Sequence, residues 1–272
     1  MTYFGFLIGF VLGPIVLLLI WSLVDSQVRK WCSPDKRSLP LVYSFLIIAG
    51  IATLYTTPWD NYLVATRVWW YDPRLVLGIT IGWVPLEEYL FFILQPILGG
   101  LLLIFLLSRK AFRVDGEPLR PNLRRSFVSI AVLVWIAAIF LMFAGRTATT
   151  YLGLELVWAI PAITLQLAYG ADIIWRHRRE VIVAVFALTI YLSLADAIAI
   201  QSGVWTINPM KSLGLLLVGI LPVEEFVFFL LTNTMVGFGF VLVWSPESRT
   251  RLRGIWQKTK YGQQSPHLSK EL

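Results

Sequence analysis

The sequence predicts an all-α integral membrane protein with about seven transmembrane helices, built as two parallel three-helix repeats joined by a linking helix. Three observations predict this fold. Of the 272 residues, 57% are hydrophobic and 14% are charged, which lies outside the usual range of soluble globular domains. Seven apolar windows can each hold a span of about 20 residues. One pattern of acidic, aromatic and proline residues occurs twice.

The apolar windows give the expected spans in chain order. They run over residues 4–23, 40–57, 75–107, 127–144, 152–174, 181–200 and 213–243. The third and seventh are too long for one straight span, since a hydrocarbon core of about 30 Å needs about 20 residues. Proline suits the start of a helix and breaks its interior. We therefore expect Pro85 and Pro222 to begin these helices, with residues 75–84 and 213–221 folded over the helix starts as a half-helix or lid.

The basic residues between the windows predict the orientation. The segments after the first, third, fifth and seventh windows hold 19 of the 23 Lys and Arg residues, and the segments after the other three hold the remaining 4. By the positive-inside rule the N-terminus lies outside and the C-terminus is cytoplasmic. The net charge of +7 is thus a topology signal, and no nucleic-acid partner is expected.

The internal repeat divides the chain. Its first copy holds Asp60, Trp69, Pro73 and Pro85-Leu86-Glu87-Glu88, and its second holds Asp196, Trp205, Pro209 and Pro222-Val223-Glu224-Glu225. The offset is 136 up to Pro209 and 137 from Pro222, so one residue is inserted between. We expect a first repeat over residues 1–110, a basic inner loop and linking helix over 111–150, a second repeat over 151–245 and a basic inner tail over 246–272. One helix between the repeats makes them parallel, related by an axis along the membrane normal.

The paired acids Glu87, Glu88, Glu224 and Glu225 are the candidate catalytic groups. Helix capping would explain a single glutamate in a first turn. Four in matched pairs indicate a functional site, because each acid in a span costs a few kcal/mol. Neighbouring carboxyl groups in apolar surroundings do not both ionise easily, so one can donate a proton while the other stays a base. Successive helix residues diverge by about 100°, so the acting couple lies either within one repeat or across the two.

Asp60 and Asp196 end the second and sixth predicted helices. Two interpretations stay open: solvated acids at the outer face, or further catalytic residues that orient the glutamates or close the site. Farther along the third and seventh helices, Gln95 and Asn233 are expected to hydrogen-bond between helices.

Aromatic side chains surround the paired acids. The candidate substrate-binding residues are Trp69, Trp205, Tyr89, Phe91, Phe92, Phe226, Phe228 and Phe229. An interfacial belt and helix packing would account for many of them, but aromatic faces also stabilise a cation. An acid, a base and aromatic walls suit protonation of an alkene, ring closure through a carbocation and loss of a proton.

No cofactor is expected. The sequence has no flavin or nicotinamide fingerprint, so the reaction should be redox-neutral. The single cysteine, Cys32, and the two histidines, His177 and His267, offer neither a redox dithiol nor a metal cluster.

Three motifs carry a family resemblance. They are Thr56-Thr57-Pro58-Trp59-Asp60, then Pro85-Leu86-Glu87-Glu88 with Tyr89 and Phe91-Phe92, and Pro222-Val223-Glu224-Glu225 with Phe228-Phe229-Leu230-Leu231-Thr232-Asn233. With them the chain resembles the membrane-integral lycopene cyclases, which occur as two small subunits in some bacteria and as a domain of fungal bifunctional lycopene cyclase/phytoene synthases. The resemblance covers nearly the whole chain, with both halves fused.

The resemblance implies cyclisation of the linear ψ-ends of lycopene to β-ionone rings, which gives β-carotene via γ-carotene in a multi-pass cell-membrane protein. The four glutamates of the doubled motif would be the catalytic residues. Lycopene and other linear carotenes in the bilayer, membrane lipid and other carotenoid-pathway enzymes are the implied partners. The ring type, β, ε or γ, stays open.

The alternative is a small-molecule transporter, either SWEET-like or proton-coupled. A three-one-three helix arrangement with parallel repeats is also the plan of the SWEET transporters. Pro14, Pro85, Pro161 and Pro222 could serve as hinges. A neutral sugar needs no acidic pairs, whereas a proton-coupled carrier would use them.

Overall fold

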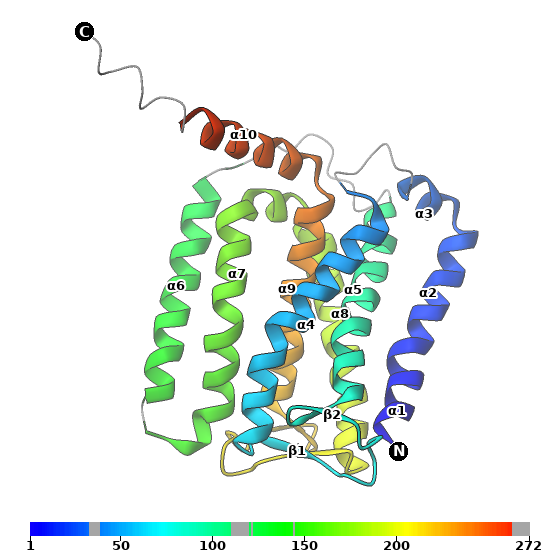
Figure 1. The fold of residues 1–272 in the computed structure, drawn as a ribbon, viewed down its shortest axis with the longest axis vertical. Helices are drawn as coiled ribbons and strands as arrows, with labels where there is room; N and C mark the ends of the chain where they lie inside the picture. Colours follow the sequence, from blue (N-terminus) through cyan, green and yellow to red (C-terminus); the bar gives the residue numbers. More distant parts are fainter. Residues whose placement is uncertain (33–38, 110–119, 121, 144, 263–272) are drawn as a thin grey trace.

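The computed structural model describes residues 1–32, 39–109, 120, 122–143 and 145–262, and within them it forms a bundle of helices (Figure 1). Seven helical segments of this part are long and apolar enough to cross a membrane, which confirms the predicted number of spans. The first is Tyr3–Val24, made of α1 (Tyr3–Phe6), the π-helix η1 (Leu7–Leu12) and α2 (Gly13–Val24). The short helix α3 (Ser26–Trp31) follows.

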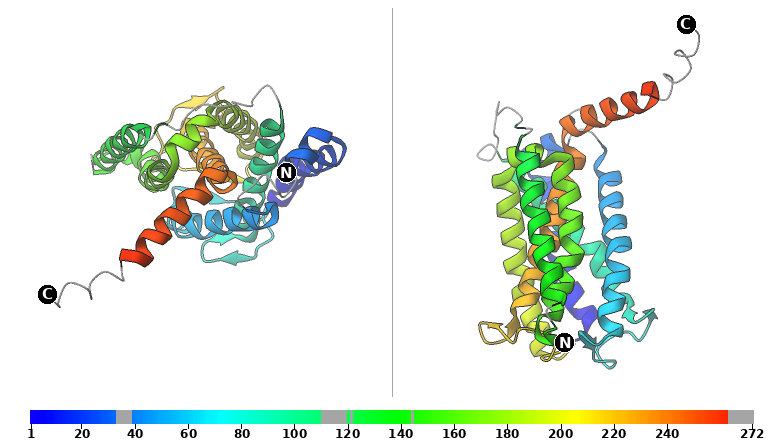
Figure 2. Two further views of the ribbon diagram at one scale, coloured as in Figure 1. Left: turned by 90° about the horizontal axis from the view of Figure 1, so that it is seen from above. Right: turned by 90° about the vertical axis from the view of Figure 1, so that its left-hand side faces the viewer.

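Each of the other six spans is one long helix. These helices are α4 (Leu41–Ala65), α5 (Leu86–Ser108), α6 (Asn122–Phe143), α7 (Thr150–Arg176, preceded by the 3-10 turn η4, Thr147–Thr149), α8 (Arg178–Gln201) and α9 (Val223–Trp244). Helix α7 is kinked at Gly170. Helix α6 packs against α7 at one side of the bundle (Figures 1 and 2).

Helices α5 and α9 form the centre of the bundle. In each, 61% of the span is buried, against 17% for Tyr3–Val24, 22% for α4 and 11% for α6. Gln95 on α5 donates a hydrogen bond from Nε2 to Oδ1 of Asn233 on α9, at 2.9 Å, as the sequence predicts. The two helices that carry the paired glutamates are therefore the best fixed parts of the fold.

Each central helix begins directly after its predicted proline, Pro85 or Pro222. The stretches before the prolines are not half-helices. They form two short hairpins, β2 (Thr80–Ile81) with β3 (Val84–Pro85) and β5 (Leu216–Leu217) with β6 (Leu221–Pro222). The first hairpin turns through two residues and the second through three. The residue inserted between the two copies of the sequence pattern thus lies in the second turn.

A third strand pair joins the two halves of the chain. β1 (Trp69–Tyr71) runs antiparallel to β4 (Trp205–Ile207), with Trp70 opposite Thr206. These strands are equivalent segments of the sequence repeat, so each strand pairs with its own counterpart. The flanking bonds match as well: the Asp72 N–H donates to the Val204 carbonyl, and the Asn208 N–H donates to the Val68 carbonyl.

Helix α4 is longer than its apolar window. It runs through Pro58 to Ala65, so Asp60 lies inside the helix and not at its end. Asp196 likewise lies inside α8, which ends at Gln201.

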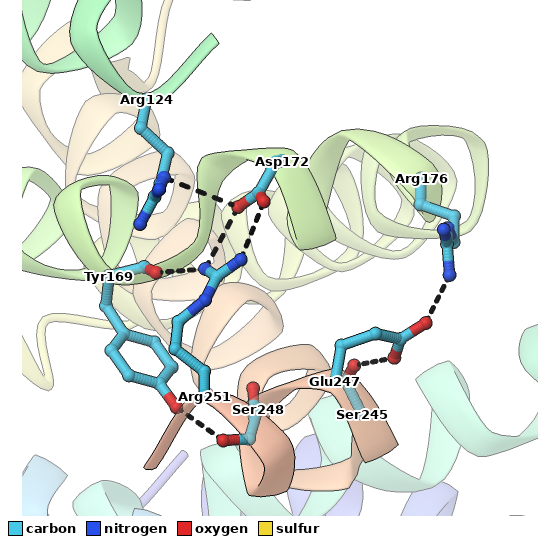
Figure 3. Close-up of polar contacts among 8 residues, drawn as sticks. All are labelled: Arg124, Tyr169, Asp172, Arg176, Ser245, Glu247, Ser248 and Arg251. Carbon is cyan, nitrogen blue, oxygen red and sulfur yellow. Dashed lines mark hydrogen bonds and ion pairs between the residues drawn. The ribbon is translucent and has the colours of Figure 1, made fainter. Parts of the chain in front are cut away.

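Helix α10 (Pro246–Gly262) begins at the end of the bundle opposite the N-terminus and extends outward beyond the bundle (Figures 1 and 2). Part of the predicted basic tail is therefore a helix. Arg251 binds Asp172 on α7 through two hydrogen bonds, Nη1 to Oδ1 at 3.0 Å and Nη2 to Oδ2 at 2.7 Å, and also donates to the Tyr169 carbonyl. Arg176 pairs with Glu247 nearby (Figure 3). These contacts fasten α10 to α7.

We expect Asp172→Asn to loosen α10. Asparagine keeps one acceptor but loses the charge that holds Arg251, which weakens the docking of α10 by about 1.5 kcal/mol. Trypsin should then release the C-terminal segment of the detergent-purified protein roughly tenfold faster, because 1.4 kcal/mol is a factor of 10. The matched control is Asp72→Asn, which removes the exposed ion pair with Arg74 at the other end of the molecule. Equal cleavage rates in Asp172→Asn and wild type would contradict this role.

Candidate active site

A cavity lies between the starts of α5 and α9, at the end of the bundle that holds the N-terminus. Its lining comes from both halves of the chain. Four carboxyl groups line it: Asp60, Glu88, Asp196 and Glu225. The rest of the lining is aromatic apart from Ile207: Tyr3, Phe6, Trp59, Trp69, Tyr71, Phe91, Phe92, Tyr151, Trp205, Phe228 and Phe229. The fold thus brings the acids of both motif copies into one site.

The first glutamate of each pair points away from this cavity and holds the chain before its helix. Oε1 of Glu87 accepts a hydrogen bond from the Leu77 N–H at 2.6 Å. Oε1 of Glu224 accepts one from the Leu213 N–H, also at 2.6 Å. Both side chains are fully buried. The first glutamates therefore fix the segment that leads into each hairpin, as matched structural anchors.

The second glutamate of each pair faces the cavity and accepts hydrogen bonds from tyrosines. Oε2 of Glu88 accepts from the hydroxyls of Tyr3 at 2.5 Å and Tyr71 at 2.9 Å. Oε1 of Glu225 accepts from the Tyr151 hydroxyl at 2.8 Å. None of these tyrosines is among the residues predicted from the sequence. Tyr3 and Tyr151 each lie at the start of the first span in their half of the chain. This equivalent position is the one sequence signal that could have identified them.

Asp60 and Asp196 are buried, not solvated at the face of the protein. Each is 1% exposed. Oδ1 of Asp196 accepts a hydrogen bond from the Trp205 indole N–H at 2.9 Å, and Asp196 lines the same cavity as Glu225. Neither oxygen of Asp60 has a hydrogen-bond partner among the described residues. Both aspartates therefore belong to the carboxyl cluster of the cavity.

Six of the eight predicted aromatic binding residues line the cavity, and two do not. The Tyr89 hydroxyl donates to the Ile81 carbonyl at 2.8 Å and accepts from Asn61 Nδ2 at 3.0 Å, so this side chain supports the first hairpin. Phe226 lines a separate apolar groove beside α8 and the second hairpin.

An aromatic stack on one wall was not predicted from the sequence. The rings of Trp59 and Trp158 stack at 4.2 Å and 15°, and Trp59 lies parallel to Phe228 at 5.8 Å and 4°. Trp69 meets Trp59 edge-on at 5.7 Å. Rings held this way present fixed π-surfaces, which attract a cation.

The electrostatics of the cavity favour proton transfer. Its lining contains four carboxyl groups and no Lys or Arg side chain among the described residues. Removing several carboxylates from water without a counter-charge is costly, so the cluster must hold protons. Burial, together with the nearby Asp60 and Glu88, raises the pKa of the Tyr71 hydroxyl well above its usual value. Tyr71 therefore stays a hydrogen-bond donor to Glu88.

Comparisons with known proteins find related sequences over most of the chain. The family model described as lycopene cyclase matches residues 1–106 and 148–243. A lycopene beta-cyclase of Halobacterium salinarum is 39% identical over 206 residues, which cover 72% of this chain and 80% of the relative.

Two fungal relatives are longer. The bifunctional lycopene cyclase/phytoene synthase of Podospora anserina is 32% identical over 207 residues, 73% of this chain and 34% of that protein. The enzyme of the same description from Blakeslea trispora is 30% identical over 245 residues, 88% of this chain and 38% of that protein. No solved structure matches significantly.

Proposed function

The chain belongs to the lycopene cyclase family, and from that premise we propose that it cyclises the linear ends of lycopene to β-ionone rings, giving β-carotene via γ-carotene. The observation that carries this proposal is the single cavity in which acids of both motif copies meet aromatic walls. The reaction only moves protons and closes a ring, so product and substrate are isomers. The family membership decides against the transporter alternative.

The second glutamates, Glu88 and Glu225, are the proposed acid and base. One of them, protonated, adds its proton to the terminal double bond of the linear end. The resulting carbocation closes on the neighbouring alkene, and the other glutamate, as carboxylate, removes a ring proton. One proton enters and one leaves, which balances the step. The rings of Trp59 and Phe228, which line the cavity, support the passing cation, and Asp60 and Asp196 complete the carboxyl cluster.

The first glutamates, Glu87 and Glu224, serve this chemistry indirectly. Their bonds to the Leu77 and Leu213 N–H groups fix the hairpins next to the cavity. Those hairpins in turn lead into the helix starts that carry Glu88 and Glu225. We therefore assign them a positioning role.

The membrane arrangement follows from the distribution of basic residues. We propose that the N-terminus lies outside and the C-terminus in the cytoplasm, which sets the cavity toward the outer leaflet. The two repeats would span residues 1–110 and 151–245, with 111–150 as linker and 246–272 as inner tail. The family match supports this division because it omits residues 107–147. Lycopene and other linear carotenes would enter from the bilayer, and other carotenoid-pathway enzymes are the candidate partners.

Pigment analysis tests the proposed function directly. Cells that accumulate lycopene should convert it to β-carotene when they express this chain, as measured by chromatography against an empty-vector control. The retention time and spectrum of the product also identify its ring type. Persistence of lycopene in cells whose membranes contain the folded protein would overturn the proposal.

A further inference from the structure

Glu88 and Glu225, the second glutamates of the two pairs, have different surroundings, although they occupy equivalent positions in the sequence repeat. Glu88 accepts two phenol hydrogen bonds on one oxygen, from Tyr3 and Tyr71. Glu225 accepts one, from Tyr151, and the residue equivalent to Tyr71 is Ile207. Hydrogen bonds to a carboxylate stabilise its charged form. The Glu88 side of the cavity is therefore better suited to a carboxylate.

The Glu225 side holds an additional acid instead. Tyr3 and Tyr151 are equivalent, because their N–H groups bond to the carbonyls of Leu75 and Lys211, which are 136 residues apart. Glu155 follows Tyr151 by four residues, as Leu7 follows Tyr3. Glu155 is therefore the equivalent of Leu7 in the second half. Glu155 lies one turn after Tyr151 on α7, and residues four apart share a helix face. It is 0% exposed.

Glu155 has features that a structural residue does not need. Neither of its carboxyl oxygens has a hydrogen-bond partner among the described residues. Its carboxyl group lies in the neighbourhood of Glu224 and Glu225 on α9 and of the Tyr151 hydroxyl. Burying a carboxylate that has no hydrogen-bond partner costs far more free energy than burying the neutral carboxylic acid. Glu155 therefore holds a proton, and the hydroxyl of Tyr151, one turn earlier on α7, donates a hydrogen bond to Glu225.

We propose that Glu155 is a proton-holding residue that keeps Glu225 protonated through the Tyr151 hydroxyl, so that Glu225 is the proton donor and Glu88 the acceptor. This inference rests on the proposed cyclase function. When Glu225 gives its proton to the alkene, the Tyr151 hydroxyl proton moves to Glu225 and the Glu155 proton moves to Tyr151. Glu88 meanwhile takes the ring proton.

The cycle closes within the cavity. Asp60 lines the cavity together with Glu88 and Glu225, so the proton held by Glu88 returns across the cavity once the cyclic product has left. Until then Glu155, through Tyr151, keeps Glu225 protonated, and the returning proton finally restores Glu155. The titratable groups that face this path are Tyr151 on α7, Glu224 on α9, Asp196 on α8, Asp60 on α4 and Glu88 on α5. No protons are gained or lost over one turnover.

The test measures turnover of lycopene against pH, in membranes that contain equal amounts of folded protein. Glu155→Gln cannot supply a proton, so its kcat should fall about tenfold at neutral pH and recover toward wild type in acid, where Glu225 is protonated from solution. Glu155→Asp restores the carboxyl group and should regain most of the neutral-pH activity. Tyr71→Phe, a control on the Glu88 side, should lose activity without recovery in acid.

The outcomes separate the two proposals. An unchanged pH profile in Glu155→Gln, or a loss by the same factor at every pH, would overturn the role of Glu155 and leave the cyclase function intact. Absence of cyclic product from wild type would overturn the function itself. If Glu155→Gln gives too little folded protein, Glu155→Asp decides: a pH profile displaced from that of wild type is expected, and an unchanged one contradicts the proposal.

Discussion

Replacing Glu88 or Glu225 with glutamine should lower the turnover of lycopene by at least about 100-fold. General acid and base groups contribute about 10²- to 10⁴-fold to rates, and glutamine can neither give nor take the proton. Its amide oxygen can still accept the tyrosine hydrogen bonds that now reach each carboxylate. The variants should therefore insert and fold. Initial rates of cyclic carotene formation in membranes, normalised to folded protein, provide the measurement.

The first glutamates provide matched controls for this experiment. In Glu87→Gln and Glu224→Gln the amide oxygen still accepts the N–H of Leu77 or Leu213, so both variants should keep activity within about tenfold of wild type, since a tenfold change is only 1.4 kcal/mol. All four substitutions are the same change, in adjacent residues of the same two helices. Equal losses in all four variants would contradict the division into anchoring and proton-transferring glutamates.

The sequence predicts the spans and the central helices well because those features depend on composition and covalent constraint. A span needs about 20 apolar residues wherever it packs. Pro85 and Pro222 fix the starts of α5 and α9 because proline lacks the N–H that a helix interior needs. Because each glutamate pair directly follows the start of its helix, both pairs lie at the same end of the bundle. The change of offset also shows in the sequence that one residue is inserted in the second repeat. It does not show that this residue lies in the turn of the second hairpin.

The hairpins could not be predicted from hydropathy. Residues 75–84 and 213–221 are apolar like the helices they precede, and only their glycines argue otherwise. Gly82 and Gly219 adopt positive φ values of 68° and 74° in the two turns, which glycine adopts at little cost. The strand pair between Trp69–Tyr71 and Trp205–Ile207 depends on both halves meeting, and no local signal records such a contact.

The prediction of the site was incomplete for a similar reason. The sequence identifies the four glutamates and two aspartates but treats each glutamate pair as a unit. The direction of each side chain depends on which residues pack around the first turn. The Tyr3 and Tyr151 hydroxyls reach glutamates 85 and 74 residues away in the chain. Such contacts follow from helix packing, which a single sequence does not show.

The distance between Glu88 and Glu225 is set by how closely α5 and α9 pack. Farther along these helices, Gly100 on α5 meets the ring of Phe240 on α9, which is fully buried. A Cβ atom at Gly100 would lie 2.7 Å from Cζ of Phe240 and closer still to Cε1 of Phe45 on α4. Real Cβ atoms do not approach so closely, so a side chain at this position must displace the rings of Phe45 and Phe240 or move the helices apart.

We therefore expect Gly100→Val to destabilise the protein by about 3 kcal/mol, the upper end of the usual cost of overpacking, and to reduce cyclisation because the carboxyl groups on α5 and α9 separate. Unfolding by a denaturing detergent, followed by near-ultraviolet circular dichroism, measures the loss of stability. Gly50→Val is the matched control, since Gly50 lies on α4 with no atom within 4 Å of the place that a Cβ atom would take and shares the same helix-propensity change. A stability of Gly100→Val equal to that of Gly50→Val would show that α5 and α9 do not need this close approach, and the spacing of the two glutamates would then have another cause.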